Sequence, residues 1–183
     1  MDSNTEAIQT ITENIQSVKD LLGCMSQLNK DQFNSCINAV DLSDCDFEPY
    51  STWSDACYTR NCLYCDERYE VILICWEPGQ QTPIHDHGGE ECWVKIISGT
   101  IKETIYKPDA TDTPVAISTN IAEPGHTSYM IDFMGCHRLE NDSNQRAMSL
   151  HIYAKPIAQC NIYDEESAQY VLKDLSYDCI VEV

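Results

Sequence analysis

Apolar residues recur at steps of three and four along residues 5–29, which is the spacing of one face of a helix. The stripe consists of Ile8, Ile11, Ile15, Val18, Leu21, Leu22, Met25 and Leu28. It predicts one amphipathic helix whose apolar face packs on a core. A second, shorter helix is predicted over residues 31–40.

From Cys57 onward the pattern changes to short runs rich in Ile, Val, Tyr and Thr, separated by Gly, Pro, Asn and Asp. The runs are YTRNCLY, YEVILICWEPG, CWVKIISGTIKETIY, HTSYMIDF, CHRLEN and AMSLHIYAKP. Many short strands without long helices between them predict an all-β sandwich or barrel. Residues 109–114 are typical of a polar loop, whereas AQYVLKDL near the C-terminus fits either a helix or a strand.

The length and charge of the chain limit what it can be. Its 183 residues are 43% hydrophobic, which suits one domain with a sizeable core better than two. Asp and Glu number 30 against 11 Lys and Arg, which gives a net charge of −19. Such a surface repels nucleic acids and anionic membranes, so neither is an expected partner. An anionic substrate would need a local cation to hold it.

The cysteines and the N-terminal residues indicate the cellular compartment in which the protein is expected. The first residues are polar and acidic and lack the apolar centre of a signal peptide, and no apolar run reaches the ~18 residues of a membrane span. We therefore expect a cytoplasmic protein, in which 11 cysteines do not form a disulfide scaffold. Cys62 and Cys65 form a single CxxC, which alone is weak evidence for a zinc or redox site.

Two histidines, His85 and His87, are separated by one residue, so a strand would present both on one face. They lie within the pattern G-x5-H-x-H-x4-C-x6-G, which runs from Gly79 to Gly99. This spacing resembles the first motif of cupin barrels, in which the position of Cys92 is usually a glutamate ligand. The second cupin motif contains a histidine and an asparagine with three residues between them, and HRLEN in this chain, from His137 to Asn141, resembles it.

Glu91 is an alternative to Cys92, because a slightly shorter motif spacing would make Glu91 the fourth ligand. Strand parity favours Cys92, which shares the apparently inward face with Val94 and Ile96, whereas Glu91 shares the other face with Trp93.

Together the two motifs predict a metal site formed by His85, His87 and His137. Three neutral imidazoles without a carboxylate leave coordination positions open, as in catalytic sites, and suit iron, zinc, copper or nickel. His126 lies outside both motifs, and we expect it in a strand or turn without a metal.

With these motifs in place, the sequence resembles the cysteine dioxygenases, a cupin family of thiol dioxygenases, and in particular the animal type. The matching segments are YTRN (58–61), ILICWEPG (72–79), IHDH (84–87), CWVKIISGTIKETIY (92–106), GCHRLEN (135–141) and SLHIY (149–153). The resemblance implies a single cupin (jelly-roll-like) β-barrel domain over residues 1–183. Its N-terminal helical segment would span about 1–45 and its barrel core about 50–160.

The resemblance also implies an activity. Members hold one Fe(II) by three histidines, here His85, His87 and His137, and oxidise L-cysteine with O2 to cysteine sulfinic acid, the first step of cysteine catabolism. The arginine that pairs with the substrate carboxylate falls on Arg60, and a tyrosine near it falls on Tyr58. L-Cysteine and O2 are then the expected partners of a monomeric protein.

Further residues follow from the same resemblance. Members carry a Ser-x-His-x-Tyr run near the iron, which falls on Ser149, His151 and Tyr153, and strand parity puts all three on one face. In animal-type members a thioether joins the residues that match Cys92 and Tyr153, which would account for a cysteine at the usual glutamate position. After the tyrosine, relatives read Ser-Pro where this chain has Ala154 and Lys155, so the backbone there is expected to differ.

Two rival functions remain. A 3-mercaptopropionate-type dioxygenase is disfavoured because such relatives tend to have glutamine in place of Arg60 and no cysteine at the position of Cys92. A non-enzymatic metal-binding cupin sensor is disfavoured by the open three-histidine site and by the Ser149, His151 and Tyr153 row.

Overall fold

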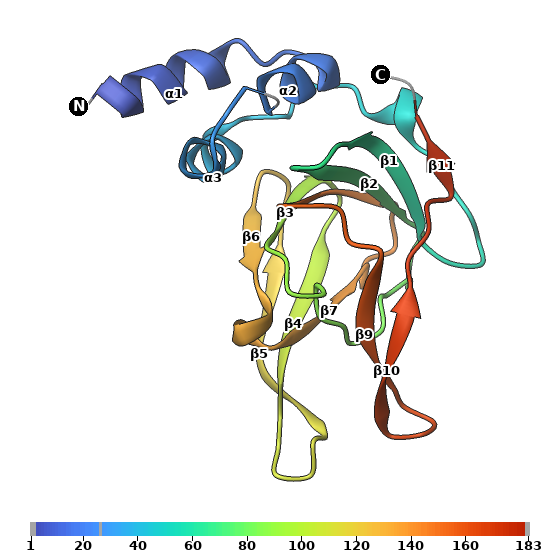
Figure 1. Ribbon diagram of the computed structural model, residues 1–183. Coiled ribbons are helices and arrows are strands. Elements are labelled where there is room, and N and C mark those ends of the chain that lie inside the picture. Colours follow the sequence, from blue (N-terminus) through green and yellow to red (C-terminus); the bar gives the residue numbers. More distant parts are fainter. Residues whose placement is uncertain (1–2, 26, 182–183) are drawn as a thin grey trace.

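The computed structural model describes residues 3–25 and 27–181 and shows three N-terminal helices beside a barrel of strands (Figure 1). The helices are α1 Ser3–Glu13, α2 Val18–Met25 and α3 Lys30–Ala39. The later elements are η1 Glu48–Tyr50, β1 Thr59–Cys65, β2 Glu70–Trp76, β3 Cys92–Ser98, β4 Ile101–Pro108, β5 Pro114–Ala122, β6 Thr127–Met130, η2 Asp132–Met134, β7 Cys136–Glu140, β8 Ala147–Tyr153, β9 Gln159–Asp164, β10 Gln169–Asp174 and β11 Cys179–Ile180. The predicted all-β cupin barrel with short N-terminal helices is confirmed.

The single helix predicted over residues 5–29 is wrong, because the chain forms α1 and α2 with a break between them. Ser17 accepts a hydrogen bond from the backbone N–H of Asp20 at 3.1 Å and donates one to its carboxylate at 2.7 Å. These bonds cap the start of a new helix, as serine does at helix N-termini. Asn29 and Gln32 form a capping box at the start of α3, which confirms the predicted second helix to within one residue.

The strands form two facing sheets and a hairpin. The larger sheet has the order β11-β1-β2-β8-β3-β6, the smaller has β5-β4-β7, and β9 pairs with β10. The segment AQYVLKDL, which fitted either a helix or a strand, contains β10, and the predicted polar loop joins β4 to β5. The CxxC of Cys62 and Cys65 lies within β1.

The larger sheet is buried on both faces. Its outer face carries Trp93 and Leu150, which pack in one apolar cluster with Leu21 of α2 and Phe33 of α3. The helices lie over this face of the sheet (Figure 1). Its inner face lines the barrel with a second cluster that includes Ile72, Trp76, Cys92, Val94, Ile96 and Tyr153. The predicted inward face of β3 is therefore confirmed, and the helices explain why the other face is also apolar.

Gly135, two residues before His137, occupies a position that requires glycine. Its φ of 120° lies in a region that favours glycine, and a Cβ there would collide with the carbonyl oxygen of Tyr106 on β4. Glycine therefore lets β7 approach β4 closely just before His137.

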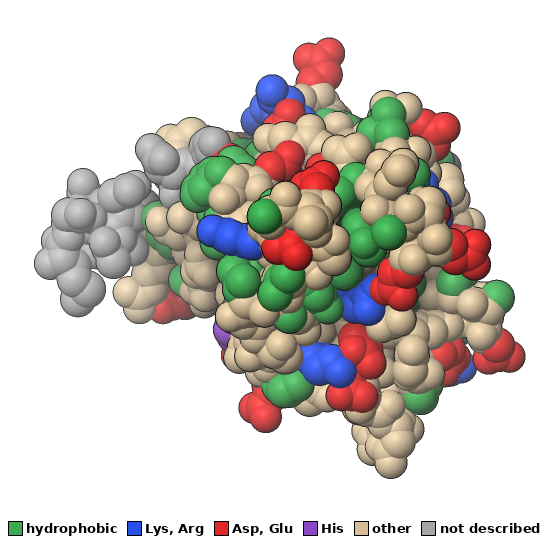
Figure 2. Space-filling view, turned by 90° about the horizontal axis from the view of Figure 1, so that it is seen from below, with side chains coloured by type: hydrophobic (Ala, Val, Ile, Leu, Met, Phe, Trp, Pro, Cys, Tyr) green, Lys and Arg blue, Asp and Glu red, His purple; other side chains and the backbone are tan. Residues whose placement is uncertain are grey.

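The end of the barrel opposite the helices carries scattered acidic side chains, single basic ones and apolar ones between them (Figure 2). Among the described residues, no basic patch gathers on this face. Within the described part of the chain, no helix has both the length and the apolar character needed to cross a membrane.

Candidate metal centre and its cavity

Backbone pairing brings two of the predicted metal ligands together. His85 and His137 exchange two hydrogen bonds, each from the N–H of one to the carbonyl oxygen of the other at 3.0 Å. His137 lies on β7, whereas His85 lies in the loop between β2 and β3. The ring centroids of the two histidines are 4.7 Å apart.

The loop that carries His87 is fixed by two aspartates. The backbone N–H of His87 donates to Asp132 at 3.0 Å. Asp86, between the two loop histidines, accepts from the backbone N–H of Asn161 at 2.8 Å and from its side-chain amide at 2.7 Å. Asn161 lies on β9, so the loop is held on both sides although it has no regular structure of its own.

The ring nitrogens of the three histidines converge. One ligand nitrogen from each of His85, His87 and His137 lies within 4.8 Å of the other two, and the Nε2 atoms of His87 and His137 are 3.1 Å apart. Nδ1 of His85 is directed to the carbonyl oxygen of Pro83 at 3.0 Å, which leaves its Nε2 for a metal. The predicted ligand set is therefore assembled in one place.

Burial keeps two of these imidazoles, His85 and His87, in the neutral form that binds metals. It lowers the pKa of His85 to about 3, with a further contribution from His137 nearby. It also lowers the pKa of His87 well below its ordinary value, with contributions from the other two rings. Three convergent imidazoles fit a divalent transition metal such as iron.

Glu103 is a site residue that the sequence did not reveal. Its Oε1 lies 2.7 Å from Nδ1 of His137, and because a carboxylate only accepts, the imidazole donates. Burial is the largest single effect and would raise the pKa of Glu103, but the interactions with His137, Ser128 and His126 together outweigh it, so the pKa is lowered. The bond directs Nε2 of His137 towards the other histidines, as carboxylate–histidine pairs do in metal sites.

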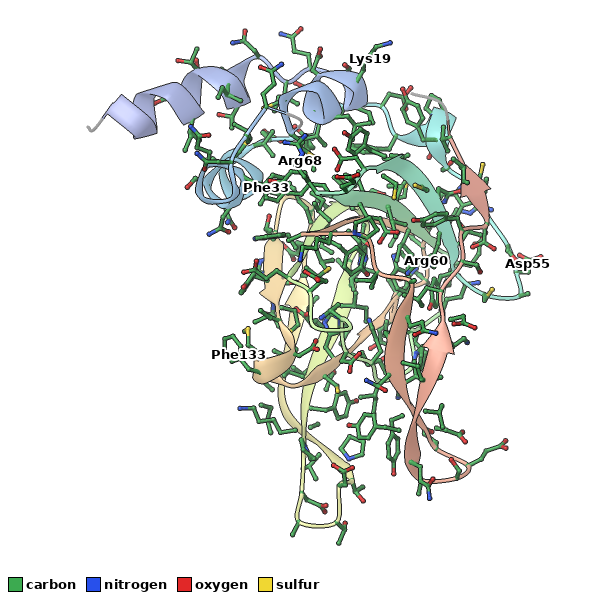
Figure 3. All side chains as sticks on the ribbon, in the orientation of Figure 1. Lys19, Phe33, Asp55, Arg60, Arg68 and Phe133 are labelled. Carbon is green, nitrogen blue, oxygen red and sulfur yellow. The ribbon has the colours of Figure 1, made fainter. Side chains whose placement is uncertain are left out.

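A partly open cavity lies beside the metal centre, and His85 is the metal ligand that lines it. Its lining includes Tyr58, Arg60, Thr82, His85, His151, Tyr153, Ile157 and Cys160. Arg60 enters from β1 (Figure 3), and its Nη2 is buried without a hydrogen-bond partner among the described residues. The ring of Tyr58 packs on Trp76 with centroids 4.9 Å apart. The cavity thus combines a metal ligand, a cation and phenol groups.

The predicted row on β8 forms a buried chain of hydrogen bonds. Nε1 of Trp76 donates to Oγ of Ser149 at 2.9 Å, and this Oγ lies 2.9 Å from Nε2 of His151. Because the indole can only donate, the serine proton is free to go to Nε2 of His151. Burial, followed by the nearby charge of Arg60, lowers the pKa of His151 well below its ordinary value. His151 is therefore neutral and carries its proton on Nδ1.

Cys92 and Tyr153 are direct cross-strand neighbours. They are Cα partners in the antiparallel pairing of β3 with β8, and both are buried on the inner face. Side chains at such positions have Cβ atoms about 4.5–5.5 Å apart. Burial raises the pKa of both the Cys92 thiol and the Tyr153 phenol. The alternative residue, Glu91, accepts a hydrogen bond from the hydroxyl of Tyr129 at 2.6 Å and is not part of the histidine group.

Two further predictions concern residues near this site. His126 lies in the turn before β6 and is exposed, outside the histidine group. Lys155, where relatives have proline, has a φ of 142°. A proline fixes φ near about −65°, so the backbone after Tyr153 has a conformation that proline could not adopt.

The chain is similar to several proteins of known identity. A family model described as "Cysteine dioxygenase type I" matches residues 1–166. The proteins named "Cysteine dioxygenase type 1" of Bos taurus and Homo sapiens are each 27% identical over 162 residues, covering 83% of this chain and 81% of their own length. The protein of that name in Danio rerio is 25% identical over 177 residues, covering 88% and 86%. Among solved structures, TT1209 from Thermus thermophilus has 19% identity and a TM-score of 0.48, covering 61% of this chain and 96% of that one.

Proposed function

Since the chain belongs to the cysteine dioxygenase type I family, we propose that it oxidises L-cysteine with O2 to cysteine sulfinic acid. The observation that best supports this substrate is Arg60, whose buried Nη2 has no partner among the described residues and which lines the same cavity as His85. A buried, unpaired donor is costly, and a substrate carboxylate would supply its acceptor.

The proposal assigns one Fe(II) to His85, His87 and His137. Bound there, the ion would supply open coordination positions at which a thiolate and O2 meet. Imidazoles alone would also suit zinc, copper or nickel, so the family match supports the choice of iron. Glu103 fixes the orientation of His137, and Asp86 fixes the loop of the other two ligands.

Arg60 and Tyr58 bind the substrate in this proposal. The planar guanidinium matches the two oxygens of a carboxylate, which a lysine would not do as well. The ring of Tyr58 is held against Trp76 and lines the cavity beside Arg60, where it braces the pair. In a chain with a net charge of −19, this local cation is what makes an anionic substrate acceptable.

The reaction adds both atoms of O2 to sulfur. The thiol sulfur gives up four electrons, O2 accepts them, and the thiol proton is released with the sulfinate. The side chains of Tyr153 and His151 line the cavity and would steer the reacting groups. The hydrogen bonds from Trp76 through Ser149 keep His151 in the tautomer with its proton on Nδ1.

We also propose that a thioether joins Cys92 to Tyr153 in part of the molecules. The direct pairing of the two residues on neighbouring strands supports it. Forming the bond removes one hydrogen from the thiol and one from the ring, and iron with O2 is the oxidant. A tethered phenol would hold its hydroxyl in one place beside the substrate.

The division of the chain remains part of the proposal. It consists of one domain acting as a monomer, with a helical segment over about 1–45 and a barrel core over about 50–160.

Comparing the oxidation of three thiols at equal concentration distinguishes the proposed function from its two alternatives. Iron-loaded protein is given cysteine, 3-mercaptopropionate or cysteamine, and O2 consumption and products are measured. Cysteine is expected to be oxidised fastest, to its sulfinate. Faster oxidation of 3-mercaptopropionate would favour the other thiol dioxygenase class, and no O2 consumption with any thiol would favour a binding protein.

A further inference from the structure

The C-terminal strap, defined as residues 175–181, lies beyond the part of the chain that the family model matches. It runs from the end of β10 to β11 and passes beside β1, which carries Arg60 (Figure 1). β11 pairs with β1 in parallel, and the backbone N–H of Val181 donates to the carbonyl oxygen of Cys62 at 2.9 Å. At its other end, Leu175 donates to the carbonyl oxygen of Ala158 at 2.8 Å.

Arg60 makes three hydrogen bonds with this strap. Its backbone N–H donates to the carboxylate of Asp178 at 2.8 Å, and its carbonyl oxygen accepts from the N–H of Asp178 at 2.9 Å. Its side-chain Nε donates to the carbonyl oxygen of Ser176 at 3.1 Å. The strap therefore holds both the backbone and the guanidinium of one residue.

These contacts determine which nitrogen atoms of the Arg60 guanidinium are left to bind a substrate carboxylate. The group is planar and its donors have fixed directions, so the bond from Nε to Ser176 sets the orientation of the whole plane. Nη2 of Arg60 is then buried and has no partner among the described residues. An arginine held in this way needs less reorganisation when a carboxylate arrives.

Tyr177 anchors the middle of the strap to the barrel. Its hydroxyl donates to the carboxylate of Glu70, a buried residue on β2 that is the Cα partner of Tyr153. The other oxygen of Glu70 lies 3.4 Å from the backbone N–H of Ile157. The strap is thus attached to the barrel in two ways, through the bond from Tyr177 to Glu70 and through the pairing of β11 with β1.

We propose that Asp178 and Tyr177 are positioning residues, which hold Arg60 in the orientation that pairs with the carboxylate of the thiol substrate. This inference rests on the proposed function, because it takes Arg60 as the carboxylate partner. Both residues act on substrate binding through Arg60 rather than through the metal histidines. Asp178→Ala and Tyr177→Phe should therefore weaken cysteine binding and raise KM, with little change in kcat.

The expected size follows from the bond to Arg60 that Asp178→Ala loses and the bond to Glu70 that Tyr177→Phe loses. Tyr177→Phe also loses a weaker contact with Sγ of Cys65 at 3.9 Å. Net values of about 0.5–1.5 kcal/mol correspond to a rise in Kd or KM of about two- to tenfold. Asp178→Asn keeps a side-chain oxygen that can accept from the N–H of Arg60, so it should rescue most of the binding lost in Asp178→Ala. Ile180→Ser is the matched control, because this side chain of the strap is 74% exposed.

Calorimetric titration of the iron-loaded protein with cysteine, without O2, measures binding apart from turnover. Each strap variant is made alone and together with Arg60→Gln, and its iron content and thermal unfolding are checked. If the strap acts through Arg60, Tyr177→Phe should change the Kd by less than about twofold in the Arg60→Gln background.

The outcomes separate this inference from the proposed function. If the unmodified protein does not bind cysteine, or Arg60→Gln binds it equally well, the proposed function is wrong. If Arg60→Gln weakens binding but Tyr177→Phe and Asp178→Ala bind cysteine like the control, the strap has no positioning role. An equal loss in both backgrounds would also overturn the inference, since the effect would not pass through Arg60. If Asp178→Ala does not fold, Tyr177→Phe, which keeps the aromatic ring, still decides the question.

Discussion

Replacing Glu103 with glutamine should weaken iron binding, although Glu103 is not itself a ligand. The amide keeps the size of the side chain and one acceptor oxygen for Nδ1 of His137. It loses the negative charge that strengthens the 2.7 Å hydrogen bond and raises the basicity of the ring. The three ligands themselves remain in place.

The magnitude follows from the burial of the pair. Glu103 is 7% exposed and His137 is fully buried, so water cannot replace the lost interaction. Changes to such carboxylate partners cost about 10- to 100-fold in metal affinity, which is about 1.4–2.7 kcal/mol. We expect Glu103→Gln near the lower end of this range, because an acceptor is retained, and Glu103→Ala near the upper end.

Competition with a chelator of known affinity measures the iron Kd of each variant. Glu140→Gln is the control, since this residue loses the same charge on the adjacent strand but pairs with Lys102 at the surface. If Glu103→Gln bound iron as tightly as the control while His137→Ala had lost the metal, Glu103 would not strengthen iron binding.

Further variants test three separate parts of the site. Alanine at any one of the three metal histidines should remove iron and activity together, whereas His126→Ala should keep both; metal analysis showing full iron in all of them would contradict the ligand assignment. Arg60→Gln should cost cysteine binding on the order of 1.5–3 kcal/mol and thiols without a carboxylate much less, as calorimetry can show. Cys92→Ser should abolish the loss of two hydrogens seen by mass spectrometry of the intact protein after turnover and should lower activity without abolishing it. Peptide mapping that always finds Cys92 free would refute the thioether.

Features that depend on local pattern could be predicted from the sequence. The period of two placed Cys92 and Val94 on the inner face of β3, and the same rule placed Ser149 and His151 on the inner face of β8. The motif spacing identified three histidines that the structure brings together. The break between α1 and α2 was missed because the apolar stripe continues through it, and only the Ser17 cap signals a new start.

Features that depend on how distant strands align could not be predicted. Glu103 is one of several polar residues along β4, and only the pairing of β4 with β7 brings it beside His137. The pairing of Cys92 with Tyr153 likewise depends on a register that neither strand specifies alone, and only the family resemblance led us to expect the two residues together. Asp178 reaches Arg60 across 118 positions of sequence, outside every motif, so nothing local marks it as part of the site.

The central claim is that iron held by His85, His87 and His137 lets this protein add both atoms of O2 to the sulfur of L-cysteine. Isotopically labelled O2 tests it most directly, with iron-loaded protein, unlabelled water and mass analysis of the product. We expect cysteine sulfinic acid that carries two labelled oxygen atoms, formed at the rate at which O2 is consumed. A sulfinate with one labelled oxygen, or cystine as the main product of O2 consumption, would contradict it.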